Sequence, residues 1–162
     1  MSVADELLRA NDTYAASFTK GALPMPPGKH VAIIACMDAR LDPARALGLE
    51  EGDAHVIRNA GGRAADAIRS LVISQQLLGT REVIIVHHTD CGMLTFTDEQ
   101  LQNQVEKHLG ARPSQAFLAF SDLDQSVRDD IKEVKASPYL LKDVTVRGFI
   151  YDVKTGRVHE VV

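Results

Sequence analysis

Short, continuous apolar runs alternate along the chain with longer segments whose apolar residues recur at helical spacing. Runs of this length are typical of strands that are buried on both faces of a parallel sheet. Asp42 before Pro43 marks a helix start, and Gly79 marks a helix end. The sequence predicts strands at residues 31–35, 54–57, 82–87, 144–151 and 158–161, and helices at 3–19, 64–78, 97–109 and 122–136, with a short one from 43.

This alternation predicts an α/β fold with a mainly parallel central sheet flanked by helices. The turn at residues 154–156 adds a C-terminal antiparallel edge hairpin. The 162 residues fit one domain, which we place at residues 28–162. Residues 1–27 contain a helix and a proline-rich connector, too little chain to form a core. We expect them to be an N-terminal arm that packs on a partner subunit.

Charge and composition narrow the function classes. The chain has 18 Lys and Arg against 22 Asp and Glu, a net charge of −4, so it has no bulk attraction for nucleic acid or anionic lipid. Its apolar runs are too short to span a bilayer. The first ten residues lack the pattern of a signal peptide. These features favour a cytoplasmic protein with neither nucleic acid nor a membrane as partner.

The two cysteines follow two different predicted strands. Cys36 comes directly after the strand at 31–35, and Cys91 lies with His88 just beyond the strand at 82–87. Ligands of parallel sheets bind beyond the carboxyl ends of the strands, so the three side chains converge if these strands are neighbours. Two thiolates and an imidazole suit zinc, and three protein ligands leave an open fourth position, as in catalytic sites.

Asp38 lies two residues from Cys36, so its carboxylate can come near the metal. It could orient a water on the zinc, or it could bind the zinc as a fourth ligand and close the site. Arg40 bears on this choice, because a bidentate pair with Asp38 would hold the carboxylate off the metal and keep it ionised. If Asp38 does switch between these positions, we expect activity to rise with pH.

With these residues in place the sequence resembles the β-class carbonic anhydrases, in a form similar to their compact microbial branch. The resemblance covers roughly residues 28–162. The motifs that carry it are Cys36-x-Asp38-x-Arg40, Arg58-Asn59-Ala60-Gly61-Gly62, His88-Thr89-Asp90-Cys91-Gly92-Met93 and Gly148-x-x-Tyr151-Asp152-Val153-x-Thr155-Gly156.

The resemblance implies one Zn²⁺ per chain and a homodimer or dimer of dimers, in which N-terminal helices embrace the neighbour. It implies the reversible hydration of CO2 to bicarbonate and a proton by zinc-bound hydroxide. The implied zinc ligands are Cys36, His88 and Cys91, and the implied catalytic pair is Asp38 with Arg40.

Other functions remain open at this point. Relatives in and near the compact branch hydrolyse carbonyl sulfide or carbon disulfide, which are linear like CO2, and the motifs do not separate the three substrates. A non-catalytic zinc or thiol sensor and a thiol enzyme with Cys36 as nucleophile are less favoured. A stable Cys36–Cys91 disulfide is disfavoured in the cytoplasm.

Several neighbouring residues carry weaker expectations. Asp90 is expected to have a structural role, capping the turn between the ligands. His87 is next to a ligand and could shuttle protons, but neighbours in a strand point to opposite faces, so we expect it to be buried elsewhere. Gly61 and Gly62 either let backbone approach the metal pocket or serve only a tight turn.

Overall fold

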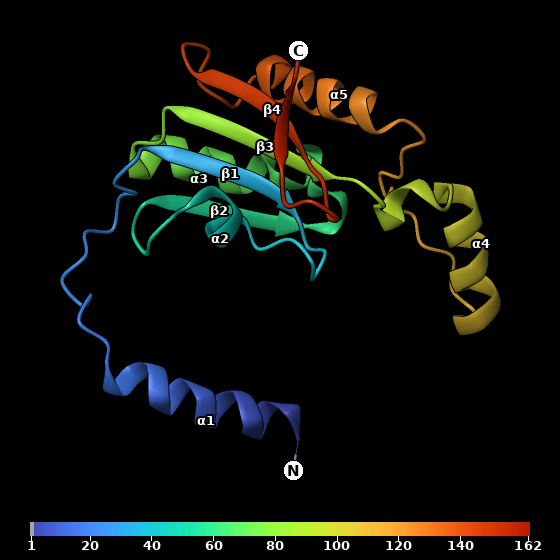
Figure 1. Cartoon of the computed structure of the whole chain (residues 1–162). Coiled ribbons are helices and arrows are strands. Elements are labelled where there is room, and N and C mark those ends of the chain that lie inside the picture. Colours follow the sequence, from blue (N-terminus) through green and yellow to red (C-terminus); the bar gives the residue numbers. More distant parts are fainter. Residues whose placement is uncertain (1) are drawn as a thin grey trace.

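The computed structural model describes residues 2–162 and confirms the predicted α/β class (Figure 1). Five strands form one sheet in the order β2-β1-β3-β4-β5. The first four strands are parallel, and β4 and β5 form the antiparallel edge pair. The strands are β1 (Val31–Cys36), β2 (Ala54–Asn59), β3 (Glu82–His88), β4 (Thr145–Tyr151) and β5 (Val158–Val161).

Helices α3 (Ile68–Leu78) and α5 (Leu123–Ala136) cover one face of the sheet. Alternate residues of the central strands, such as Ile34 and Ile85, are fully buried there with Leu71 of α3. Because β1 is buried along its whole length, it reads as a continuous apolar run rather than an alternating one.

The opposite face of the sheet is more open. The five-residue helix α2 (Pro43–Leu47) lies on this side, where Leu47 packs against the cluster that contains Val31 and Ile33. A largely apolar cavity of about 460 Å³ remains over β1, β3 and β4. Its lining includes Val31, Ile33, Leu49, Ile84, Val86 and Phe149.

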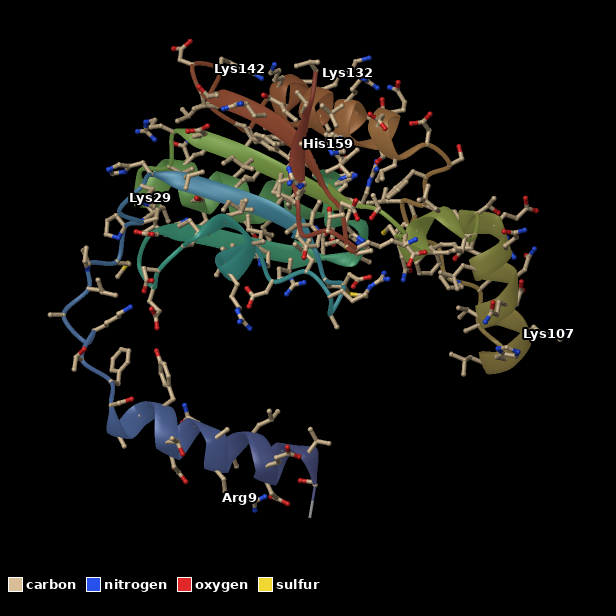
Figure 2. The ribbon with its side chains drawn as sticks, in the orientation of Figure 1. Arg9, Lys29, Lys107, Lys132, Lys142 and His159 are labelled. Carbon is tan, nitrogen blue, oxygen red and sulfur yellow. The ribbon has the colours of Figure 1, made fainter. Side chains whose placement is uncertain are left out.

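Two helices project from the body (Figure 1). Neither α1 (Val3–Ala16) nor α4 (Asp98–Leu109) contains a buried residue. Figure 2 shows the labelled side chains of Arg9 on α1 and Lys107 on α4 far from the sheet. No helix in the described part of the chain is long and apolar enough to cross a membrane.

Two predicted helix boundaries are wrong. The helix expected at 3–19 ends at Ala16, where the backbone N–H of Ser17 turns back to the carbonyl of Tyr14. The helix expected at 64–78 is α-helical only from Ile68. A separate 3-10 turn, η2 (Ala65–Ala67), comes first, because the chain bends at Ala67, which is fully buried against the sheet.

Candidate metal centre

The strand order brings the three predicted ligands together. β1 and β3 are parallel neighbours with Ala35 opposite Val86, so both strands end at the same edge of the sheet. Cys36 is the last residue of β1 and His88 the last of β3, and a short turn returns Cys91 to the same place. One ligand atom from each residue lies within 4.8 Å of the others, and all three side chains are buried. This is the one such cluster within residues 2–162.

The His88 imidazole is arranged as metal ligands usually are. Its Nδ1 lies 2.8 Å from the carbonyl oxygen of Thr89, so Nδ1–H donates there and Nε2 is left with its lone pair. Nε2 is buried and has no hydrogen-bond partner among the described residues. A buried nitrogen without a partner is costly, and a metal ion bound by Cys36 and Cys91 would satisfy it. The donor set therefore fits zinc.

The two thiols differ in acidity because they share one hydrogen bond. The Cys91 thiol lowers the pKa of Cys36, an effect that outweighs the burial of the sulfur. Conversely, Cys36 raises the pKa of Cys91. The pKa of His88 is lowered by burial, but its contact with the Cys36 sulfur and the Thr89 carbonyl raises it overall. The pair therefore favours one thiolate, at Cys36, and a metal ion bound there would displace the proton that Cys91 retains.

Asp38 and Arg40 form the bidentate pair that their spacing allows. The Nε and Nη2 atoms of Arg40 lie 3.0 Å and 2.8 Å from the two oxygens of Asp38, and the backbone N–H of Arg40 donates to Oδ1 at 2.8 Å. These bonds from Arg40 hold the pKa of Asp38 well below its usual range. Asp38 Oδ2 lies 3.7 Å from Nε2 of His88, at the margin of the ligand cluster.

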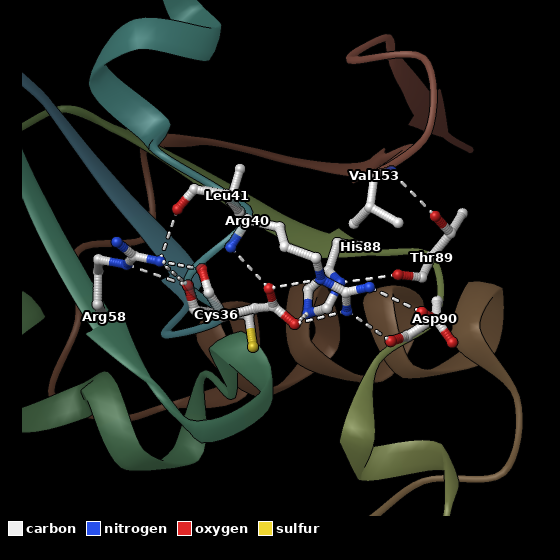
Figure 3. A network of polar contacts seen from close by, with 9 residues as sticks. Cys36, Arg40, Leu41, Arg58, His88, Thr89, Asp90 and Val153 are labelled. Atoms are coloured by element: carbon white, nitrogen blue, oxygen red, sulfur yellow. Dashed lines mark hydrogen bonds and ion pairs between the residues drawn. The ribbon is translucent and has the colours of Figure 1, made fainter.

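A second arginine holds the loop between Cys36 and Leu41 (Figure 3). The guanidinium of Arg58 donates to the backbone carbonyls of Cys36, Asp38 and Leu41 at 2.7–3.1 Å. The sequence placed Arg58 in a motif but indicated nothing of this contact, because backbone carbonyls carry no residue-type signal.

The turn after β2 packs tightly against the strand ends. The side chain of Asn59 bridges it, accepting from the backbone N–H of Arg63 at 2.7 Å and donating to its carbonyl at 3.0 Å. Gly62 has φ +65°, and a Cβ there would lie 2.9 Å from the backbone nitrogen of Cys36. This glycine therefore serves both expectations, the tight turn and the close backbone approach.

Outside the ligand set, the structure confirms one expectation and corrects another. His87 is buried and contacts Ser126 and Asp130 of α5 at 2.7 Å and 2.9 Å, away from the metal ligands. Asp90 has a structural role, as expected, but the form of that role differs from the cap we expected: its carboxylate accepts a hydrogen bond from Arg40 at 2.7 Å.

A cavity of about 390 Å³ opens onto the cluster. Its lining combines Cys36, His88 and Cys91 with Asp38 and with apolar side chains, chiefly Met37, Met93 and Phe96. A buried Cys2His set at the carboxyl edge of a parallel sheet, open on one side, defines a zinc-dependent α/β enzyme.

Comparisons with known proteins specify this class. A family model described as carbonic anhydrase matches residues 31–116. β-Carbonic anhydrase 1 of Mycobacterium tuberculosis is 52% identical over 162 residues, covering 99% of each chain. The solved structure of a carbonic anhydrase from Glaciozyma antarctica is 54% identical, with a TM-score of 0.94 and complete coverage of both chains. A carbon disulfide hydrolase of Acidianus is 32% identical, covering 96% of this chain and 87% of its own. The chain belongs to the β-class carbonic anhydrases.

Proposed function

We propose that this protein catalyses the reversible hydration of CO2 to bicarbonate and a proton. The observation that carries the proposal is the buried Cys36, His88 and Cys91 cluster, beside which Arg40 holds the carboxylate of Asp38. We assign the three clustered residues as ligands of one Zn²⁺ and the other two as the catalytic pair. Bound there, zinc supplies the Lewis acidity that activates water at neutral pH.

With zinc bound by the three clustered residues, Asp38 would accept a hydrogen bond from a reacting water and orient it. Its bonds with Arg40 favour the ionised, accepting form of the carboxylate and would hold it beside the metal. Its place at the margin of the cluster, 3.7 Å from His88 Nε2, is also short enough for a closed state in which Asp38 becomes a fourth ligand.

The apolar lining of the cavity suits an uncharged substrate. Met37, Met93 and Phe96 offer no hydrogen bonds, so they accept a small apolar molecule without the cost of removing water from polar groups. The bicarbonate ion gains nothing from this lining, which favours its departure into solvent.

Stopped-flow CO2 hydration by the zinc-loaded protein, at neutral and at alkaline pH, tests the proposal. Fast turnover at both values supports an open zinc site, and turnover only at alkaline pH supports a site gated by Asp38. Absence of turnover at both, with zinc confirmed in the protein, would contradict the proposal.

Matched variants assign the residues. Cys91→Ala should lose zinc and activity together. Asp38→Asn should keep zinc and lose about 10² in kcat, the usual size of an acid–base contribution. Asp66→Asn, an exposed carboxylate on η2, is the control and should change neither quantity. Full hydration activity in Asp38→Asn would refute the role assigned to Asp38.

A zinc hydrolase of carbonyl sulfide or carbon disulfide is the second candidate. The similarity to a carbon disulfide hydrolase and the apolar lining of the cavity both favour it. Sulfide release from either substrate, faster than CO2 hydration by the same sample, would establish it. A non-catalytic sensor would show neither reaction with zinc bound.

We also propose that the protein is a homodimer, or a dimer of dimers, held by its N-terminal arm, residues 1–27. Helix α1 has no buried residue, and it exposes Val3, Leu7 and Leu8. An isolated helix of 14 residues is marginal in water, so a partner surface is needed to cover this apolar face. The open face of the sheet offers an apolar surface of this kind.

We place the protein in the cytoplasm on the chemistry of its thiols. Cys36 and Cys91 are both free, and their sulfurs lie within 4.8 Å of each other. Such a pair is kept as thiolate ligands in a reducing compartment, whereas an oxidising one would favour a disulfide. Fractionation of the cells that make the protein, followed by thiol labelling, would test this placement. Recovery in the cytoplasmic fraction with both thiols free would support it, and recovery elsewhere with a disulfide would contradict it.

A further inference from the structure

The guanidinium of Arg40 is held from two sides (Figure 3). One edge faces Asp38 through Nε and Nη2. The other edge faces Asp90: Nη1 donates to its Oδ2 at 2.7 Å, and Nη2 donates to its backbone carbonyl at 3.0 Å. Two hydrogen bonds on each edge fix the plane of the group as well as its position.

Asp90 reaches Arg40 because of an unusual backbone conformation. It lies between His88 and Cys91 with φ +55°, in the left-handed region that few residues other than Gly, Asn and Asp adopt readily. This conformation turns both its carbonyl and its carboxylate toward Arg40. The turn at residues 88–91 therefore carries two residues of the metal cluster, His88 and Cys91, and also binds the guanidinium of Arg40 through Asp90.

Arg40 needs such support because its side chain is 47% exposed. A long, half-exposed arginine bound only by Asp38 would sample several rotamers, and the carboxylate would move with it. Asp90 is itself 73% exposed, so charge attraction alone stabilises the pair little in water. The contribution of Asp90 is geometric.

We propose that Asp90 is a positioning residue, which holds the guanidinium of Arg40 so that Asp38 stays oriented over the metal pocket. Asp90 lines no part of the cavity and acts through Arg40. The predicted changes in kcat rest on the proposed hydration reaction. The contact between Asp90 and Arg40 does not, because it can be measured without turnover.

Two substitutions test the proposal without disturbing the turn. Asp90→Asn and Asp90→Gly both suit the left-handed backbone, so zinc content should stay at the wild-type level. The asparagine keeps an oxygen acceptor for Arg40, and we expect kcat to fall only about threefold. The glycine keeps only the backbone carbonyl that accepts from Nη2 and loses the acceptor of Nη1. We expect a fall of about tenfold, because small misplacement of a catalytic group is costly. KM should hardly change, and Asp66→Asn is the matched control.

A double-substitution cycle separates positioning from loop stability. If Asp90 acts through Arg40, adding Asp90→Gly to Arg40→Ala should cause no further loss of kcat. A further tenfold loss on that background, or loss of zinc in Asp90→Gly alone, would overturn the proposal in favour of a loop-stabilising role. Wild-type kcat in Asp90→Gly with full zinc would also overturn it.

A readout independent of activity keeps this test distinct from that of the reaction. Hydrogen exchange of the Arg40 Nε–H, followed by ¹⁵N NMR of the zinc-loaded protein, reports its bond to Asp38. We expect exchange about tenfold faster in Asp90→Gly than in wild type. Unchanged exchange would refute the positioning role even if the protein hydrates CO2, and faster exchange would support it even if another substrate is hydrolysed.

Discussion

The strand ends at the metal cluster and the N-terminal arm differ in how firmly contacts within the chain hold them. At the strand ends, side chains bind other parts of the chain, as when Arg58 donates to three carbonyls of the loop after β1. In the arm, α1 is well capped by Ser2 and Asp5 but buries none of its side chains. The first region is held by contacts within the chain, whereas the second exposes apolar side chains that the chain does not cover.

The contacts between arm and body show the same difference. Tyr14 donates to Glu51 at 3.0 Å, and Lys20 lies 2.9 Å from Glu50. All of these side chains are exposed at the surface, where such pairs contribute about 0–1 kcal/mol each. The arm can therefore change its orientation relative to the rest of the chain at little cost in free energy. The metal cluster, by contrast, tolerates little movement of its strands.

The largest expected effect tests how tightly the strand ends are built. In Gly62→Ala the new Cβ would meet the backbone of Cys36, Ala35 and Val86 at 2.9–3.2 Å. These contacts add to the strain of a non-glycine residue at φ +65°. We expect the two effects together to lower the free energy of unfolding by about 3–4 kcal/mol. Urea unfolding of the zinc-loaded protein measures this, and zinc content should fall as β1 and β3 are forced apart.

Gly110→Ala is the matched control. Gly110 has φ +73°, but a Cβ there meets nothing within 4 Å, so only the backbone strain of about 1–2 kcal/mol applies. Equal losses in the two variants would mean that close backbone approach at Gly62 is unimportant. The claim that the strand ends at the metal cluster are tightly packed would then be wrong.

The next effect tests the arm. Replacing Leu7 and Leu8 by serine removes two large apolar side chains, which are 64% and 66% exposed in the single chain. If a partner covers them, association should weaken by about 2–3 kcal/mol, a rise in the dimer Kd of roughly 30- to 150-fold. Sedimentation over a concentration series measures this shift.

A variant on the other projecting helix provides the control for the arm. Leu109, near the end of α4, is 78% exposed, and Leu109→Ser should leave the Kd unchanged if association rests on the arm. Unchanged association in the double serine variant would contradict the arm proposal and would leave α1 as a merely solvated helix.

The sequence was most informative where chemistry and local pattern coincide. The carboxyl ends of two apolar strands located Cys36 and His88, and parallel pairing of β1 with β3 then brought them together as predicted. The Asp38–Arg40 pair was also foreseeable, because two residues of separation let the side chains meet.

What the sequence missed depends on contacts over long separations. Asp90 is 50 residues from Arg40, and it reaches the arginine only through a left-handed backbone that no local pattern announces. The 3-10 turn before α3 also depends on tertiary packing, since Ala67 is fully buried in the core. The early end of α1 is a local effect, in which the backbone N–H of Ser17 donates to the carbonyl of Tyr14.

The smallest expected effect concerns Asp98, which ties α4 to the chain that follows it. Its carboxylate accepts hydrogen bonds from the backbone N–H groups of Phe117, Leu118 and Ala119 at 2.7–3.2 Å. The Ala119 bond, ahead of the opposing effect of burial, lowers the pKa of Asp98 in the folded protein. A lowered folded pKa means that the carboxylate stabilises the fold above the ordinary pKa of about 4 and that this stability is lost at lower pH.

Asp98→Asn should therefore cost about 1 kcal/mol at neutral pH, and the cost should shrink as pH falls below about 4. Glu99→Gln is the control, because Glu99 shares the first turn of α4 and so any general effect of charge at that helix end. Urea unfolding of both variants across pH measures the difference. If the loss in free energy of unfolding of Asp98→Asn stays constant into acid, then the geometry of these hydrogen bonds, and not the charge of Asp98, secures the loop. The charge would then contribute as little to holding α4 as the surface ion pairs contribute to holding the arm.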